Sequence, residues 1–114
     1  MNRGDIVLIT FLFSDLTSTK VRPALVLSPE DPAEQDFVVA LISSNIVRPL
    51  SNTDYLLSTS DADFAEAGLK VDSVFRMAKL HNLSKSLAKR GLGKANAHLM
   101  QELEKRLRLA LGLR

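Results

Sequence analysis

Short apolar runs separated by polar turns make up most of the chain before Asn96. The first run, residues 5–13, is rich in β-branched and aromatic residues and has apolar side chains on both of its alternating faces. Two apolar faces are typical of a strand buried inside a fold. The same reasoning predicts further strands at residues 22–28, 37–43, 54–57 and 73–80, and a shorter one around Leu92.

Two local features refine these predictions. Pro23 has no backbone N–H to donate, so we expect it only at the first position of its strand. After the strand at residues 54–57, Asp61 is a candidate N-cap for a one-turn helix over residues 62–67, which Gly68 would end.

The pattern changes after Asn96, where apolar residues recur every three or four positions. This spacing predicts an amphipathic helix with Asn96 as its N-cap and Gly112 as its stop. Its apolar face would consist of Leu99, Met100, Leu103, Leu107, Ala110 and Leu111. Short strands followed by one such helix indicate a mainly β fold, a small curled antiparallel sheet or barrel with the helix packed against it. The 114 residues are expected to form a single domain over residues 1–114.

Composition bears on where the protein acts. The sequence has no cysteine, which excludes disulfides and thiolate metal sites, and no apolar run approaches the ~20 residues of a membrane helix. The first residues lack the basic, apolar and small-residue blocks of a signal peptide. We therefore expect a cytoplasmic protein that does not contact a membrane.

Charge is divided unevenly along the chain. Residues 1–69 contain four basic and ten acidic side chains, whereas residues 70–114 contain eleven basic and three acidic ones. A basic C-terminal segment favours a phosphate-rich partner, because lysine and arginine displace counterions from nucleic acid. A solvated basic helix has the same composition, so charge alone does not decide between the two interpretations.

Most catalytic motifs are missing from the sequence. It contains no glycine-rich phosphate loop, no dinucleotide fingerprint and no Gly-x-Ser-x-Gly turn. His81 and His98 are the only histidines, and we expect both at the surface. Asp61 and Asp63 lack further ligands nearby that a metal ion would need. Neither a metal site nor a cofactor is expected.

The remaining polar candidates stand at strand ends. Arg22 precedes a proline, which keeps its backbone extended. The next long strand ends in Ser43, Ser44 and Asn45. Because antiparallel neighbours place the start of one strand beside the end of the other, Arg22 and Ser43 would share a rim. A guanidinium beside a hydroxyl suits a phosphodiester. The alternative is a solvated Arg22 and a simple turn at residues 43–45.

The order of four motifs points to a known family. They are the Gly-Asp and apolar start at residues 3–7, the Arg-Pro-Ala-Leu-Val strand within residues 20–28, the strand end at residues 40–46, and residues 69–73. With the closing helix and its Leu-Gly-Leu ending, the sequence resembles the PemK/MazF family of toxin ribonucleases over nearly its whole length. The resemblance implies an SH3-like or CcdB-like small antiparallel β-barrel with a C-terminal helix, acting as a homodimer and neutralised by an antitoxin protein.

The resemblance also implies an activity. Family members cleave single-stranded RNA without a metal, by attack of the ribose 2′-hydroxyl on the adjacent phosphate. In this chain Arg22 would be the catalytic arginine, and Ser43, where many members have threonine, would hydrogen-bond the phosphate. The loop at residues 14–21 would cover the substrate groove. Candidate substrate-binding residues are Ser18, Thr19, Lys20, Ser44, Asn45 and Arg76.

The chain departs from the family pattern after Arg76. Some PemK-like members have an Arg-x-Asp arrangement late in the chain, whereas this sequence reads Arg76-Met77-Ala78 and has lost the carboxylate. Arg76 could instead form a cross-strand ion pair. The alternative function is a non-catalytic growth inhibitor of the same fold, which binds a topoisomerase as CcdB does, or binds nucleic acid.

Overall fold

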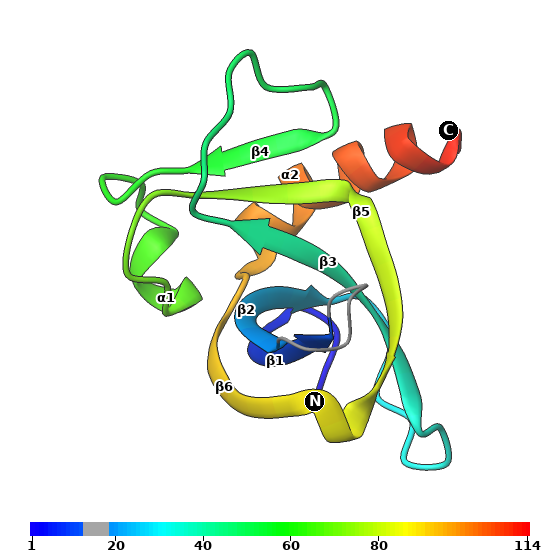
Figure 1. Ribbon diagram of the computed structural model, residues 1–114. Coiled ribbons are helices and arrows are strands. Elements are labelled where there is room, and N and C mark those ends of the chain that lie inside the picture. Colours follow the sequence, from blue (N-terminus) through cyan, green and yellow to red (C-terminus); the bar gives the residue numbers. More distant parts are fainter. Residues whose placement is uncertain (13–18) are drawn as a thin grey trace.

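One antiparallel sheet organises the protein (Figure 1). The computed structural model describes residues 1–12 and 19–114, and in this part of the chain six strands follow the spatial order β4-β5-β3-β2-β1-β6. The strands are β1 (Asp5–Leu12), β2 (Thr19–Val26), β3 (Asp36–Ser43), β4 (Asp54–Leu57), β5 (Ser73–Ser84) and β6 (Ala88–Lys94). The helices are α1 (Phe64–Ala67), the short 3-10 helix η1 (Lys85–Leu87) and α2 (Ala97–Leu111).

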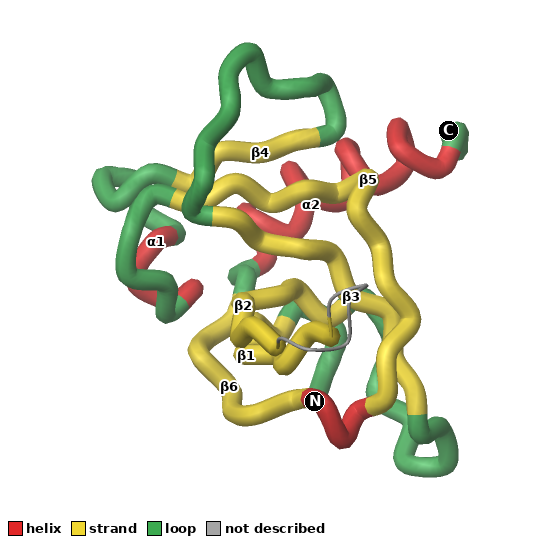
Figure 2. The backbone as a smooth tube through the Cα atoms, viewed as in Figure 1, coloured by secondary structure: helices red, strands yellow, loops and turns green. Residues whose placement is uncertain are grey.

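The sheet is strongly curled. Figures 1 and 2 show β5 bending partway along its length and β6 passing around β1 and β2. Because β4 and β6 stand at opposite ends of the strand order, the sheet formed by the described residues is open rather than a closed barrel. The predicted fold class, an antiparallel β fold with a C-terminal helix, is confirmed, with this difference in closure.

The predicted C-terminal helix is confirmed at both ends. The Asn96 side chain accepts a hydrogen bond from the Leu99 N–H (2.9 Å), and Gly112 adopts the left-handed conformation that ends the helix (φ 70°). Leu99 and Leu103 are fully buried, where α2 packs against β5 and β4. None of the helices in the described ranges is long and apolar enough to cross a membrane.

Both faces of β1 are buried, as its apolar pattern predicts. Ile6 belongs to the larger core, which α2 covers, and its neighbour Val7 belongs to a second core inside the curl of the sheet. The second core also contains Ile9, Ala24, Val26, Phe37 and Val39. Alternate residues of the central strands therefore contribute to different cores.

The prediction for Pro23 is wrong, because Pro23 lies inside β2, opposite Leu8 of β1. Backbone groups alternate along β2, since Val26 accepts a hydrogen bond from Gly4 on one side and Leu27 donates to Val38 of β3 on the other. This alternation turns the nitrogen of Pro23 toward β3. The β2–β3 ladder begins only at Ala24, so the missing N–H falls where no partner strand is paired.

Two other predictions need correction. Asp61 does not cap α1, because its carboxylate accepts a hydrogen bond from the Ser58 N–H (2.7 Å) in the preceding turn, and Asp63 occupies the N-cap position. Strand β5 runs to Ser84, well beyond the predicted residue 80. The missed residues 81–84 are polar except for Leu83, and His81 and Asn82 are exposed, so the apolar pattern of this strand ends at Leu80.

Candidate functional site

The early end of the β2–β3 ladder opens a cleft. The last pair of the ladder is Ala24 with Leu41, and Arg22 and Ser43 each lie two residues beyond it. Both residues line a cleft of about 660 Å³. Its other lining residues are Leu8, Val21, Pro23, Ile42, Ser44, Asn45, Gly68, Leu69, Lys70, Val71, Ser73, Arg90 and Leu92. The predicted shared rim of Arg22 and Ser43 is therefore present.

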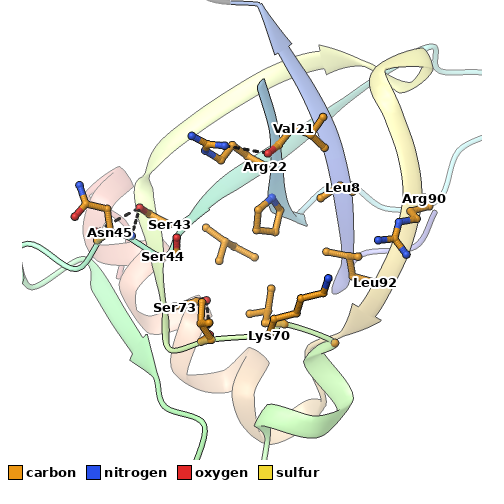
Figure 3. Close-up of a pocket in the computed structure, with 15 residues that line it drawn as sticks. Leu8, Val21, Arg22, Ser43, Ser44, Asn45, Lys70, Ser73, Arg90 and Leu92 are labelled. Carbon is orange, nitrogen blue, oxygen red and sulfur yellow. Dashed lines mark hydrogen bonds between the residues drawn. The ribbon is translucent and has the colours of Figure 1, made fainter. Parts of the chain in front are cut away.

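The lining of the cleft divides by polarity. Three apolar members, Leu8, Ile42 and Leu92, are buried or half-buried, whereas Arg22 and Asn45 are exposed, as are the apolar Val21 and Val71. Figure 3 shows the side chain of Arg22 extending from β2 toward the side where Ser43 and Asn45 lie. The cleft thus combines an apolar base with polar groups at its mouth, which suits a ligand with both flat apolar and charged parts.

Arg22 has its charge available for a ligand. Its Nη1 donates a hydrogen bond to the carbonyl oxygen of the adjacent Val21 (3.1 Å), and no carboxylate among the described residues pairs with it. A guanidinium fork with most of its donors uncommitted can bind two oxygens of one phosphate group.

Ser43 both stabilises a turn and lines the cleft. Its Oγ accepts a hydrogen bond from the Asn45 N–H (3.1 Å) and lies 3.4 Å from the Asn45 carbonyl oxygen. This local bonding fixes residues 43–45 at the end of β3, with Ser44 and Asn45 exposed at the mouth of the cleft. The turn and a polar ligand site are therefore compatible at these residues.

Sequence reasoning missed two basic residues of the cleft, Lys70 and Arg90. Lys70 follows α1 in the connection to β5, and Arg90 lies on β6 opposite Leu8 of β1. Lys70 falls within the motif at residues 69–73, which signalled the family but gave this lysine no role. Arg90 stands in the basic stretch Lys89-Arg90-Gly91, whose position relative to Arg22 depends on the β1–β6 pairing.

Among the remaining predicted substrate-binding residues, Lys20 and Arg76 are not part of this lining. Ser18 is outside the described residues, and Thr19 is placed at the start of β2, opposite Leu12. Lys20 is exposed on β2, opposite Phe11. Arg76 pairs with Asp54 of β4, whose Oδ1 lies 3.2 Å from its Nε. The structure therefore brings Arg22, Ser43, Ser44 and Asn45 together but leaves Arg76 in a cross-strand ion pair.

The chemistry of the cleft is cationic. Its described lining includes Arg22, Lys70 and Arg90 and neither an acidic residue nor a histidine. No three histidine or acidic side chains in the described ranges are grouped to hold a metal ion. Such a site can bind and stabilise negative charge, whereas proton transfer would have to use water or the ligand itself.

The histidines lie elsewhere. His81 is exposed, as predicted, and its ring contacts Phe11 edge to face. His98 is exposed as well, but its Nδ1 lies 2.8 Å from Oδ2 of Asp63, and Oδ1 of the same carboxylate accepts a hydrogen bond from the Asn96 amide (2.7 Å). The Asn96 amide and His98 lower the pKa of Asp63, and Asp63 raises the pKa of His98. Polar groups therefore do converge on Asp63, although the sequence indicated none.

The protein is a small, curled antiparallel sheet covered by a C-terminal helix, with a basic cleft lined by residues of β1, β2, β3 and β6. The sequence model of the PemK-like, MazF-like toxins of type II toxin-antitoxin systems matches residues 2–111. The chain therefore belongs to this family. No curated protein matches it in sequence.

Solved structures have the same fold. An endoribonuclease in complex with its cognate antitoxin, from a mycobacterial species, has a TM-score of 0.76 at 21% identity, covering 100% of this chain and 97% of that chain. The Mycobacterium tuberculosis toxin MazF-mt6 has a TM-score of 0.76 at 24% identity, covering 96% and 98%. MazE-MazF from Deinococcus radiodurans has a TM-score of 0.75 at 20% identity, covering 100% and 97%.

Proposed function

We propose that this protein is a metal-independent endoribonuclease toxin that cleaves single-stranded RNA. The observation that carries the proposal is the position of Arg22 and Ser43 on one rim of a cleft whose described lining contains three cations and no acid. Family membership and the resemblance to an endoribonuclease of the same fold support it.

In the proposed reaction the ribose supplies the nucleophile. Its 2′-oxygen forms a bond to the adjacent phosphorus while the bond from phosphorus to the 5′-oxygen breaks, leaving a 2′,3′-cyclic phosphate and a 5′-hydroxyl. Arg22 donates hydrogen bonds to the equatorial oxygens, where negative charge accumulates, and Ser43 donates one more. The proton leaves the 2′-hydroxyl to water, and water protonates the 5′-oxygen. DNA lacks the 2′-hydroxyl and is not cut.

Binding would use the rest of the cleft. The half-buried apolar residues Leu8 and Leu92 offer a surface for an unstacked base, and the exposed Asn45 can hydrogen-bond a base edge. Arg22 is the proposed catalytic residue in this scheme, with Ser43 as its partner, and Ser44 and Asn45 are proposed substrate contacts.

Partners follow from the same proposal. The mycobacterial endoribonuclease is in complex with its cognate antitoxin, and an acidic extended segment of an antitoxin for this chain would compete with RNA for the basic cleft. We propose that the protein acts as a homodimer. We also propose that it acts in the cytoplasm, where it would encounter RNA.

The test is cleavage of a long single-stranded RNA by purified protein in excess chelator. We expect cutting that survives chelation and is lost in Arg22→Ala, with an unchanged unfolding midpoint because Arg22 is exposed. Arg108→Ala, which removes an exposed arginine on α2, serves as the matched control and should cut normally. Absence of cutting by the native protein would favour a binding-only growth inhibitor, and full cutting by Arg22→Ala would remove Arg22 from the mechanism.

A further inference from the structure

The positively charged residues of the cleft lie on two of its sides. Arg22 lies on β2 and Ser43 at the end of β3, whereas Lys70 lies in the connection after α1 and Arg90 on β6. Figure 3 shows Arg90 and Leu92 on the side of the cleft opposite Ser43 and Asn45. The volume of about 660 Å³ exceeds the space that one phosphate group needs. A strand bound at Arg22 therefore has a second, separately built cationic wall within the same cleft.

The backbone that carries Lys70 is fixed on both sides. Before it, Gly68 adopts φ 71° and packs so closely on β6 that a Cβ there would lie 1.9 Å from the carbonyl oxygen of Leu92. After it, the Asp72 carboxylate accepts a hydrogen bond from the Thr59 N–H (2.8 Å), and Ser73 Oγ donates one to the Val71 carbonyl oxygen (2.8 Å). This turn is held in place before any ligand arrives, which lowers the entropy cost of binding.

The side chains of Lys70 and Arg90 are available for an anion. Both are exposed, and within the described residues neither forms an ion pair or hydrogen bond. The one acid in the Lys70 turn, Asp72, is engaged by the Thr59 N–H. An exposed cation without a protein partner keeps its charge available to a phosphate.

Arg90 also links the cleft to a second hollow. This neighbouring hollow, of about 490 Å³, is lined by Lys85, Lys89 and Arg90 together with Asp5 and the N-terminal Met1. Lys85 is tied to the Asp31 carbonyl oxygen (2.8 Å), whereas Lys89 is exposed on β6. A strand that continues past Arg90 therefore meets further positive charge along β6.

We infer that Lys70 and Arg90 form a second phosphate subsite, which holds a flanking phosphate of a single strand while Arg22 and Ser43 act on the scissile one. This inference rests on the proposed nuclease function. The ligand class is a single-stranded polynucleotide, because one strand presents successive phosphates to the two walls while its bases can reach the apolar base of the cleft.

The experiment measures binding separately from cleavage. A fluorescein-labelled, mixed-sequence 12-nucleotide RNA with 2′-O-methyl riboses cannot be cut, and its anisotropy reports binding to the full chain over a range of KCl concentrations. Lys70→Gln and Arg90→Gln should each weaken binding about tenfold and lower the slope of log Kd against log salt by about 0.7. Lys79→Gln, an exposed lysine of β5 outside the cleft, is the matched control and should change neither quantity.

A kinetic readout places the two residues relative to the reacting phosphate. With cleavable RNA, Lys70→Gln should raise KM and leave kcat within about threefold, whereas Arg22→Ala should lower kcat. Unchanged affinity and salt slope in both variants, or an equal loss in Lys79→Gln, would overturn the subsite. Loss of kcat in Lys70→Gln would also overturn it, by moving Lys70 to the scissile phosphate. If the native protein does not cut RNA but the affinity and slope changes appear, the nuclease proposal fails and the subsite stands.

Discussion

Arg22 on β2 and Ser43 on β3 line the same cleft, each two residues beyond the last pair of the β2–β3 ladder. Each polar group is bonded locally, Arg22 to the Val21 carbonyl oxygen and Ser43 to the Asn45 backbone. The two side chains therefore face a ligand space across an opening in the sheet. This relationship makes the role of Ser43 directly testable.

Ser43→Ala should reduce RNA cleavage about tenfold, the effect of removing one hydrogen bond to a charged group. Ser43→Thr keeps the hydroxyl and should cleave within about threefold of the native rate. Initial rates on the same single-stranded RNA give the comparison, and urea unfolding checks that both variants are folded. Equal rates for Ser43→Ala and the native protein would show that Ser43 serves only the turn at residues 43–45.

Arg76→Ala should leave cleavage and RNA affinity unchanged, because Arg76 pairs with Asp54 and does not line the cleft. The side chain of Arg76 is 40% exposed but that of Asp54 only 10%, so removing Arg76 leaves a largely buried carboxylate without its partner and should lower the free energy of unfolding by about 1–3 kcal/mol. Anisotropy titrations and urea unfolding measure the two effects. A clear loss of RNA affinity would show that Arg76 contacts the substrate, as predicted from the sequence.

Gly93→Ala and Gly91→Ala form a matched pair on β6. A Cβ on Gly93 would lie 2.2 Å from the Glu66 carbonyl oxygen, whereas a Cβ on Gly91 would meet nothing within 4 Å. Overpacking of this kind costs on the order of 1–3 kcal/mol, so the urea midpoint of Gly93→Ala should fall clearly. Gly91→Ala should stay within about 0.5 kcal/mol of the native protein. Similar stabilities for the two variants would contradict the close packing of α1 on β6.

Stability should depend on pH through His98 and Asp63. Asp63 raises the pKa of His98, so the pair's contribution is fully present below about pH 6.5, the pKa of an unfolded histidine, and is lost as pH rises through the raised value. Asn96 and then His98 lower the pKa of Asp63, so its contribution is present above about pH 4 and is lost as pH falls through the lowered value. The pair therefore stabilises the fold most between about pH 4 and 6.5.

Urea midpoints measured between pH 5 and 9 test this dependence. His98→Gln should remove the decline on the alkaline side, whereas His81→Gln, at the other exposed histidine, should keep it. Parallel profiles for His98→Gln and the native protein would show that the contact with Asp63 does not persist in solution.

Local patterns were sufficient to predict the elements that pack by a simple period. β1 and α2 bury residues at regular spacing, so Ile6, Val7 and Leu99 could be assigned to the core from the sequence. The end of β5 could not be predicted, because its polar residues His81 and Asn82 are exposed and give no apolar pattern. Periodicity therefore identifies an element where its residues are buried and misses an end where they are exposed.

The candidate site, too, could be predicted from the sequence only in part. Arg22 and Ser43 could be brought together on the assumption that two consecutive strands pair antiparallel, which β2 and β3 do. Lys70 and Arg90 could not, because their position depends on how the α1 connection and β6 fold back over β1. Arg76 was assigned by resemblance alone, and the partner that engages it, Asp54, lies on a strand whose pairing the sequence did not specify.

The proline inside β2 also bears on self-association. Two strand ends that part from each other present free N–H and C=O groups, and such groups can template pairing with a strand from another molecule. Pro23 removes one of those donors at the point where β2 separates from β3. Pro23 thereby makes the opening between β2 and β3 a poorer template for intermolecular β-pairing.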